Sequence, residues 1–167
     1  MHIGAREAGR KGVLFADAER AFPSVYTEFY EVMLILIGAP EWFLGVVRRA
    51  FRRVTHELEI AGMQRSLGVM TIGVAQGNAL SAFLFIIVYQ GLLWKLQLML
   101  LSSEMVIGYA DDVAVALECT ERLKPVLVIF YAFGALSGCF LNMSKSLWVA
   151  CEMYTDEEKN WATDCTA

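Results

Sequence analysis

The stretch Met105–Leu117 reads MVIGYADDVAVAL and places two adjacent aspartates, Asp111 and Asp112, between two apolar runs. Two apolar runs around a short polar break predict a β-hairpin whose turn carries the acids. Neighbouring carboxylates repel each other, which raises the pKa of one of them unless a cation intervenes. The alternative is that both aspartates are ordinary turn residues exposed to water. The hairpin therefore indicates either a metal site or a solvated turn.

A third acid lies in a similar setting. Asp17 ends the apolar run GVLFAD over Gly12–Asp17, which predicts a buried strand. A buried carboxylate is costly unless it is paired or bound to a metal ion. Because Mg²⁺ binds carboxylate oxygens together with substrate phosphates, Asp17, Asp111 and Asp112 are candidate metal ligands.

The rest of the sequence predicts alternating helices and strands. We expect a helix over 25–37 capped by Ser24, a helix over 41–53, a strand pair over 54–74 turning near Gly62, a buried helix over 77–101, a helix over 120–137 capped by Thr120, and a strand pair or a strand and turn over 140–151. In the second helix, the residues expected to face inward are Trp42, Val46, Ala50 and Phe51. This order predicts an α+β fold, an antiparallel sheet with helices packed on one face.

Composition narrows the class of protein. The chain has 167 residues, of which 57% are hydrophobic, so it suits one domain and is too apolar for disorder. Val69–Trp94 and Pro125–Ser144 carry no charge, but polar residues, glycines and Pro125 interrupt them, so no membrane is expected. The polar N-terminus shows no secretion signal and the four cysteines show no metal spacing. We expect an intracellular protein, nuclear or cytoplasmic and not secreted.

The charge distribution is uneven. A net charge of −4 is unusual for a nucleic-acid-binding protein. Positive charge nevertheless gathers at Arg48, Arg49, Arg52 and Arg53, which could contact a phosphate backbone or form one solvated helix face. Residues 152–167 form an acidic tail, which we separate from an expected domain over 1–151.

Four segments, taken together, resemble reverse transcriptases, especially those of LINE-type non-LTR retrotransposons and group II introns. They are FADAERAFPSV (Phe15–Val25), GVAQGNALSAFLF (Gly73–Phe85), GYADDV (Gly108–Val113) and SGCFLNMSKS (Ser137–Ser146). A lone YADD is weak evidence, but four such motifs in the family's order are specific.

The resemblance implies a polymerase palm that uses two Mg²⁺ ions, with Mn²⁺ as a substitute, for RNA-templated DNA synthesis. Asp17 and Asp111 would bridge the ions and Asp112 would help to seat one of them. Phe22 would be the steric gate against a 2′-hydroxyl, although core packing is its alternative role. The other implied roles are nucleotide binding by Ala18, Gln76 and Gly77, and protonation of the pyrophosphate by Lys145, which could equally be an ordinary exposed lysine.

Some details separate related polymerases. RNA-directed RNA polymerases usually place a second acid at the position of Phe22 and a glycine at that of Ala110, so both residues favour DNA synthesis. The chain departs from the family at Pro23, at Asn78–Ala79 and at Ala82. These substitutions affect turns and helix starts rather than the expected metal ligands.

The first motif begins close to Met1, and little sequence follows the last one. We therefore expect a palm that lacks fingers and thumb segments, which would be its partners together with an RNA template, a DNA primer and deoxynucleoside triphosphates. Three alternatives stay open: an excerpt of a working enzyme, an inactive decayed retroelement fragment, and a small membrane protein with accidental motifs.

Overall fold

A computed structural model describes residues 11–19, 21–51, 54–70, 73 and 79–151. The described elements are β1 (Gly12–Ala16), α1 (Ala21–Ser24), α2 (Thr27–Leu36), α3 (Glu41–Phe51), β2 (Val54–Ile60), β3 (Met63–Met70), α4 (Ala79–Met99), β4 (Met105–Tyr109), β5 (Asp112–Leu117), the 3₁₀ turn η2 (Thr120–Arg122), α5 (Leu123–Ser137) and β6 (Leu147–Ala150). The predicted order of strands and helices is confirmed, apart from the additional short helix α1 and the 3₁₀ turn.

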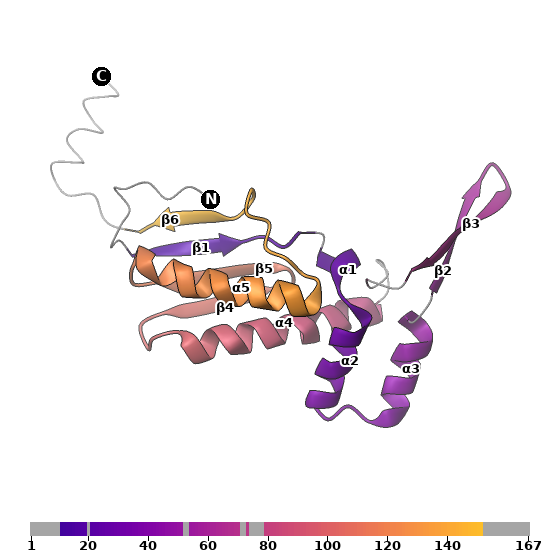
Figure 1. The fold of residues 1–167 in the computed structure, drawn as a ribbon, viewed down its shortest axis with the longest axis horizontal. Helices are drawn as coiled ribbons and strands as arrows, with labels where there is room; N and C mark the ends of the chain where they lie inside the picture. Colours follow the sequence, from indigo (N-terminus) through magenta and orange to yellow (C-terminus); the bar gives the residue numbers. More distant parts are fainter. Residues whose placement is uncertain (1–10, 20, 52–53, 71–72, 74–78, 152–167) are drawn as a thin grey trace, which may run out of the picture.

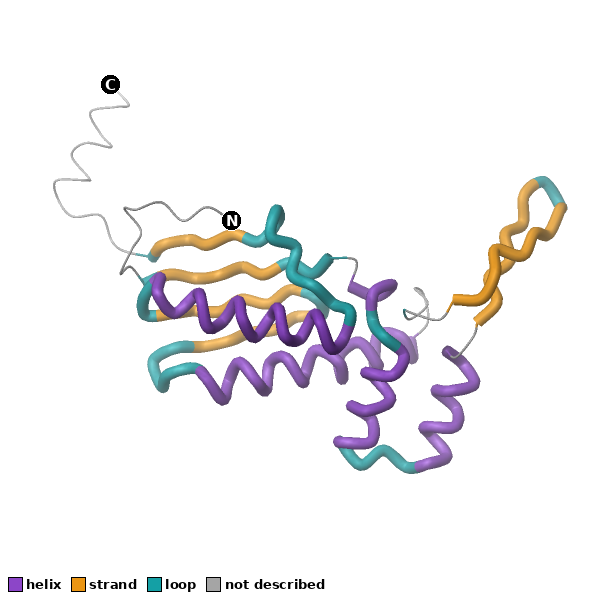
Figure 2. The backbone as a smooth tube through the Cα atoms, in the orientation of Figure 1, coloured by secondary structure: helices purple, strands orange, loops and turns teal. Residues whose placement is uncertain are grey.

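Four of the strands form one antiparallel sheet in the order β4-β5-β1-β6. The strand that follows the N-terminal residues, β1, therefore lies between the two strands that come late in the sequence (Figures 1 and 2). Its partners β5 and β6 hold it from both sides, with Ala16 opposite Val113 and Leu14 opposite Trp148. The pairing brings the predicted first motif beside the predicted aspartate hairpin.

Helices cover only one face of this sheet. Alternate residues of β1 and β5 are buried, among them Leu14, Val113 and Val115, whereas Phe15 on the other face is 51% exposed. Figure 1 shows α4 and α5 lying along the covered face. The predicted fold class, an antiparallel sheet with helices on one face, is thus confirmed.

Helix α4 is long and apolar. Its segment Leu80–Met99 could cross a membrane by length and composition, and 39% of its most apolar window is buried in the structure. The buried core helix of a soluble protein meets the same criteria. Leu84, Val88 and Leu92 belong to the hydrophobic core, which is what the sequence predicted for this helix.

Two predicted helix caps were wrong. The Ser24 hydroxyl donates to the carbonyl of Glu19 (3.1 Å) instead of capping a helix. Helix α2 begins at Thr27, and its N-cap residue, Tyr26, makes no side-chain cap bond. The cause is the extra turn α1, which contains Ser24. Similarly, Cys119 rather than Thr120 is the N-cap of the 3₁₀ turn.

The predicted inward face of α3 was also wrong in part. Phe51 is buried, but Trp42 is 70% exposed, and Val46 and Ala50 also face solvent. The buried face consists of Leu44, Val47 and Phe51. Burial of these three side chains favours this orientation, which also lets Arg48 donate to Glu31 of α2 (3.1 Å).

The hairpin of β2 and β3 turns at Ala61 and Gly62, as predicted. Both residues have positive φ angles, 51° and 79°, which two-residue hairpin turns of this kind require. Figure 1 shows the hairpin projecting away from the four-stranded sheet.

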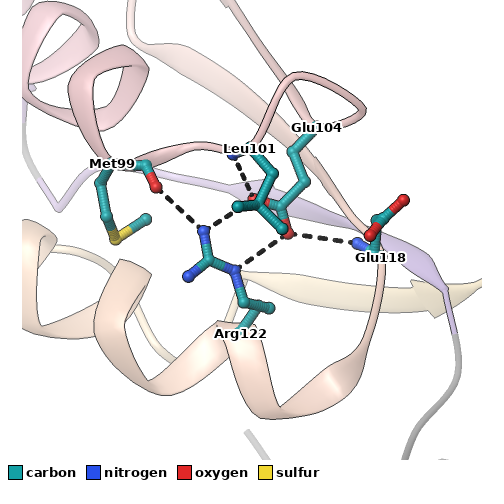
Figure 3. Close-up of polar contacts among 5 residues, drawn as sticks. All are labelled: Met99, Leu101, Glu104, Glu118 and Arg122. Atoms are coloured by element: carbon teal, nitrogen blue, oxygen red, sulfur yellow. Dashed lines mark hydrogen bonds and ion pairs between the residues drawn. The ribbon is translucent and has the colours of Figure 1, made fainter.

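A buried carboxylate holds the base of the β4–β5 hairpin (Figure 3). Glu104 accepts hydrogen bonds from Arg122 (2.8 and 3.0 Å) and from the backbone N–H groups of Leu101 and Glu118. Arg122 also donates to the carbonyl of Met99 (2.9 Å). The cluster thereby joins the end of α4, the start of β4, the end of β5 and the 3₁₀ turn. The hydrogen bond from Arg122 is the main cause that lowers the pKa of Glu104.

We predict that Glu104→Gln lowers the free energy of unfolding by about 2 kcal/mol at pH 7, because the charged acceptor is lost. Since the folded pKa lies below the ordinary value of 4.5, the stabilisation is present above that pH and is lost as the pH falls through the folded pKa. Urea unfolding at pH 7 and at acidic pH tests both points. Glu28→Gln, at an exposed carboxylate of α2, is the control. An equal loss in both variants would contradict a special role for Glu104.

Candidate active site

The pairing of β1 with β5 sets the position of two of the three predicted acids. Ala16, the last residue of β1, is opposite Val113, and Asp17 and Asp112 are the next residues along these two paired strands. By strand alternation both aspartates follow the uncovered face, on which Phe15 and Ala114 lie. The order of the motifs along the sequence did not show that β1 pairs with β5, because the two strands are far apart in the chain.

A groove of about 460 Å³ lies on this uncovered face. Its walls include Asp17, Asp112 and Lys145, and the other lining residues are Phe15, Ala16, Ile107, Tyr109, Val113 and Ala114. Cavities of this size accommodate small ligands. The groove therefore combines two carboxylates and one exposed ammonium group with apolar walls.

Asp111 does not line the groove and instead approaches Asp17 from the helix-covered side of the sheet. The turn of the hairpin consists of Ala110 and Asp111, and Ala110 has a φ of 54°, which costs a non-glycine residue about 1 kcal/mol. Asp111 and Asp17 line a small cavity of about 10 Å³ between the sheet and the helices. Asp17 thus borders both cavities, sharing the groove with Asp112 and the inner cavity with Asp111.

The segment before β6 fixes the backbone of Asp17. The N–H of Asp17 donates to the hydroxyl of Ser146 (3.2 Å), and the carbonyl of Asp17 accepts from the N–H of Asn142 (2.8 Å). Ser146 in turn donates to the carbonyl of Asn142 (2.8 Å), and Ala18 forms a β-bridge with Leu141. Sequence reasoning found the asparagine and lysine of this motif but missed that Asn142 and Ser146 hold the first acid in place.

One observation fits a cation at Asp17. The Oδ2 atom of Asp17 is buried and has no hydrogen-bond partner in the structure, and such an oxygen is costly unless it is hydrogen-bonded, neutralised or coordinated. In the described part of the chain, however, no three His, Cys, Asp or Glu side chains are close enough together to hold a metal ion. The residue types fit a magnesium site, and the three carboxylates are divided between two cavities that meet at Asp17.

The predicted steric gate is packed on α4. The ring of Phe22 stacks on that of Phe85, with centroids 4.5 Å apart and planes inclined by 20°. Phe85 is buried and Phe22 is half-buried. The stacking gives Phe22 a fixed orientation while part of its surface stays accessible.

Gly73, the first residue of the segment Gly73–Phe85, lies beside the end of the segment Phe15–Val25. The N–H of Gly73 donates to the carbonyl of Val25 (2.7 Å). Gly73 has a φ of 91°, and a Cβ atom there would lie 2.7 Å from the carbonyl oxygen of Pro23, so only glycine fits. Gln76 and Gly77, two of the predicted nucleotide-binding residues, lie outside the described residues.

The arginine cluster is largely structural where it is described. Arg48 forms ion pairs with Glu31 (3.1 Å) and Glu41 (3.0 Å). Arg49 is exposed, and its Nε donates to the carbonyl of Gly45. Arg52 and Arg53 lie outside the described residues. For Arg48, the ion pairs favour helix packing over contact with a phosphate backbone.

Two polar side chains from the helix layer border the inner cavity, and sequence reasoning missed both of them. Burial, followed by the effects of Cys139, Asp111, Asp17 and Asp112, raises the pKa of Tyr89. Burial also raises the pKa of the Cys139 thiol to about 11, so this thiol is neutral at pH 7. The available signal for Tyr89 was a hydroxyl within an otherwise apolar stretch of α4.

Comparisons with known proteins agree on the fold. Telomerase from Candida albicans in complex with the TWJ fragment of telomeric RNA superposes with a TM-score of 0.71 at 15% identity, over 90% of this chain and 29% of that chain. Telomerase from Candida tropicalis in complex with the TWJ fragment gives 0.71 at 14% identity, over 91% and 28%. An apo telomerase from Candida tropicalis truncated from its C-terminal domain gives 0.68 at 15% identity, over 91% and 33%.

At these identities the structural likeness shows a palm-like polymerase fold. The chain spans only about a third or less of the length of these telomerases. A family model described as reverse transcriptase (RNA-dependent DNA polymerase) matches residues 2–162, which include all four motifs and both strands that carry the acids. The chain therefore belongs to the reverse transcriptase family.

Proposed function

We propose that this chain carries the catalytic centre for RNA-templated DNA synthesis by nucleotidyl transfer. The observation that supports it most is the position of Asp17, which borders one cavity with Asp111 and another with Asp112 and has a buried carboxylate oxygen without a partner. Carboxylates from two neighbouring strands are the ligand set that a pair of divalent ions requires.

In this proposal Asp17, Asp111 and Asp112 hold two Mg²⁺ ions, for which Mn²⁺ can substitute. The bound ions would lower the pKa of the primer 3′-hydroxyl and neutralise the charge of the pyrophosphate. The protein's own part is to keep Asp17 fixed, and the hydrogen bonds to Ser146 and Asn142 support that role. A rigid backbone at the ligand limits the reorganisation that transfer would otherwise require.

Lys145 is proposed as the group that protonates the departing pyrophosphate. It is exposed and lines the same groove as Asp17 and Asp112. An ammonium group at that place would also attract the triphosphate. Ala18, which is half-buried beside Asp17, and the Gln76–Gly77 pair are proposed to contact the nucleotide.

Phe22 is proposed to select deoxynucleotides. Its stacking on Phe85 supports this role, because a ring that cannot turn aside would clash with a 2′-hydroxyl. The same stacking explains why the ring can lie partly in the core and still act as a gate.

We further propose that the chain is a fragment or remnant of a retroelement enzyme of the LINE or group II intron type, because its four motifs resemble that group. Its partners would be an RNA template, a DNA primer, deoxynucleoside triphosphates and fingers and thumb segments, in an intracellular setting. Contact of Arg49, Arg52 and Arg53 with a phosphate backbone belongs to the same proposal.

The central test is primer extension on an RNA template with Mg²⁺ or Mn²⁺. We expect extension by the folded chain and at least a ~100-fold loss in Asp111→Asn, because a metal ligand is removed. Glu118→Gln, at the far end of the same hairpin, is the control. Extension by the folded chain that Asp111→Asn abolishes would overturn the decayed-remnant alternative, and normal extension by Asp111→Asn would overturn the carboxylate assignment.

Sugar selection gives a second test. We expect Phe22→Val to raise the use of ribonucleotides relative to deoxynucleotides by at least about tenfold, because the smaller side chain leaves room for a 2′-hydroxyl. Single-nucleotide incorporation measures kcat/KM for each sugar. Phe83→Val, at a more exposed ring of α4, is the matched control. An unchanged ratio in Phe22→Val would leave Phe22 as a core residue only.

A further inference from the structure

Tyr89 borders the small inner cavity that Asp17 and Asp111 also line, on the core side of the sheet. It belongs to α4 and is only 5% exposed. Its ring packs on Phe85, with centroids 4.6 Å apart, and makes an edge contact with Phe133 of α5 at 5.8 Å. These two contacts fix the ring, so the direction of its hydroxyl is set by the packing of the two helices.

The small inner cavity brings Tyr89 together with Asp17 and Asp111. Its other lining residues are Ala16, Ala18, Leu92, Val113, Phe130, Phe133, Cys139, Phe140 and Leu141. At about 10 Å³ it can hold no nucleotide, and its volume is close to that of a single water site. In this apolar lining the two carboxylates are the strongest acceptors that a phenolic hydroxyl could bind.

The buried hydroxyl of Tyr89 needs a hydrogen-bond acceptor, and a carboxylate nearby can serve as one. Burying it without a hydrogen bond costs free energy that phenylalanine, with the same ring, would avoid. Asp17 has an unpartnered buried oxygen, which is a matching acceptor.

We propose that Tyr89 is a positioning residue of the metal centre. Its hydroxyl donates to one water in the inner cavity, and that water donates to the carboxylates of Asp17 and Asp111 from the core side. One side of each carboxylate is thereby fixed, and the oxygens nearer the groove stay available for cations. This inference rests on the proposed metal-binding function. It adds a ligand-orienting group from α4, a helix that supplies none of the three acids.

The test is the affinity for Mn²⁺, measured by titration with electron paramagnetic resonance of free Mn²⁺ in the full chain. We expect Tyr89→Phe to weaken binding by about tenfold or more, the usual effect of losing a group that orients metal ligands. The unfolding temperature should stay close to that of the wild type, because the ring contacts with Phe85 and Phe133 are kept. Tyr131→Phe, at a hydroxyl of α5 that is 73% exposed, is the control and should bind normally.

The outcomes separate this inference from the proposed function. If the wild type binds Mn²⁺, Asp17→Asn abolishes binding and Tyr89→Phe binds within twofold of the wild type, only the role of Tyr89 is overturned. If the two tyrosine variants weaken binding equally, the effect is unspecific and the role is likewise overturned. If Asp17→Asn binds Mn²⁺ as tightly as the wild type, the proposed metal centre fails and the role of Tyr89 fails with it.

Discussion

The antiparallel register between β1 and β5 is the constraint on which the site depends. Pairing of Ala16 with Val113 brings Asp17 and Asp112 to the same groove, although 94 residues separate these aspartates in the chain. A slip of one residue would turn Phe15 toward the core and Asp17 away from the groove. Buried Leu14 on the helix side opposes such a slip, because the slip would expose it and remove it from its partner Val115. The hydrophobic core therefore determines the geometry of the polar site.

Other interactions support this register from both ends of the strands. At one end, Glu104 and Arg122 hold the base of the hairpin that carries Asp111 at its tip. At the other end, the backbone of Asp17 is fixed by hydrogen bonds to Ser146 and Asn142. Between them, α4 and α5 cover one face only, which leaves the opposite face for the groove. A buried polar cluster far from the carboxylates thus contributes to their position.

Much of the fold followed from the sequence, because each element has a distinct apolar pattern. The two hairpins, the long helix α4 and the one-sided sheet all correspond to runs that the sequence shows directly. The inward face of α3 did not, because periodicity alone offers two apolar stripes and packing against the rest of the chain decides which of them is buried. Ser24 and Thr120 were misjudged as caps for a related reason, since a short turn precedes each helix. For the site, the apolar context of the acids and the motif resemblance both pointed to Asp17, Asp111 and Asp112. The contacts of Ser146 and the packing of Tyr89 join segments far apart in the sequence, which local patterns do not predict.

The most direct test of the central claim is a crystal structure of the chain grown with Mn²⁺, with diffraction recorded at the manganese absorption edge. The account predicts an anomalous peak beside the groove, within coordination distance of Asp17 and of at least one of Asp111 and Asp112. Manganese bound only at other acidic residues, or no peak at saturating Mn²⁺, would contradict it.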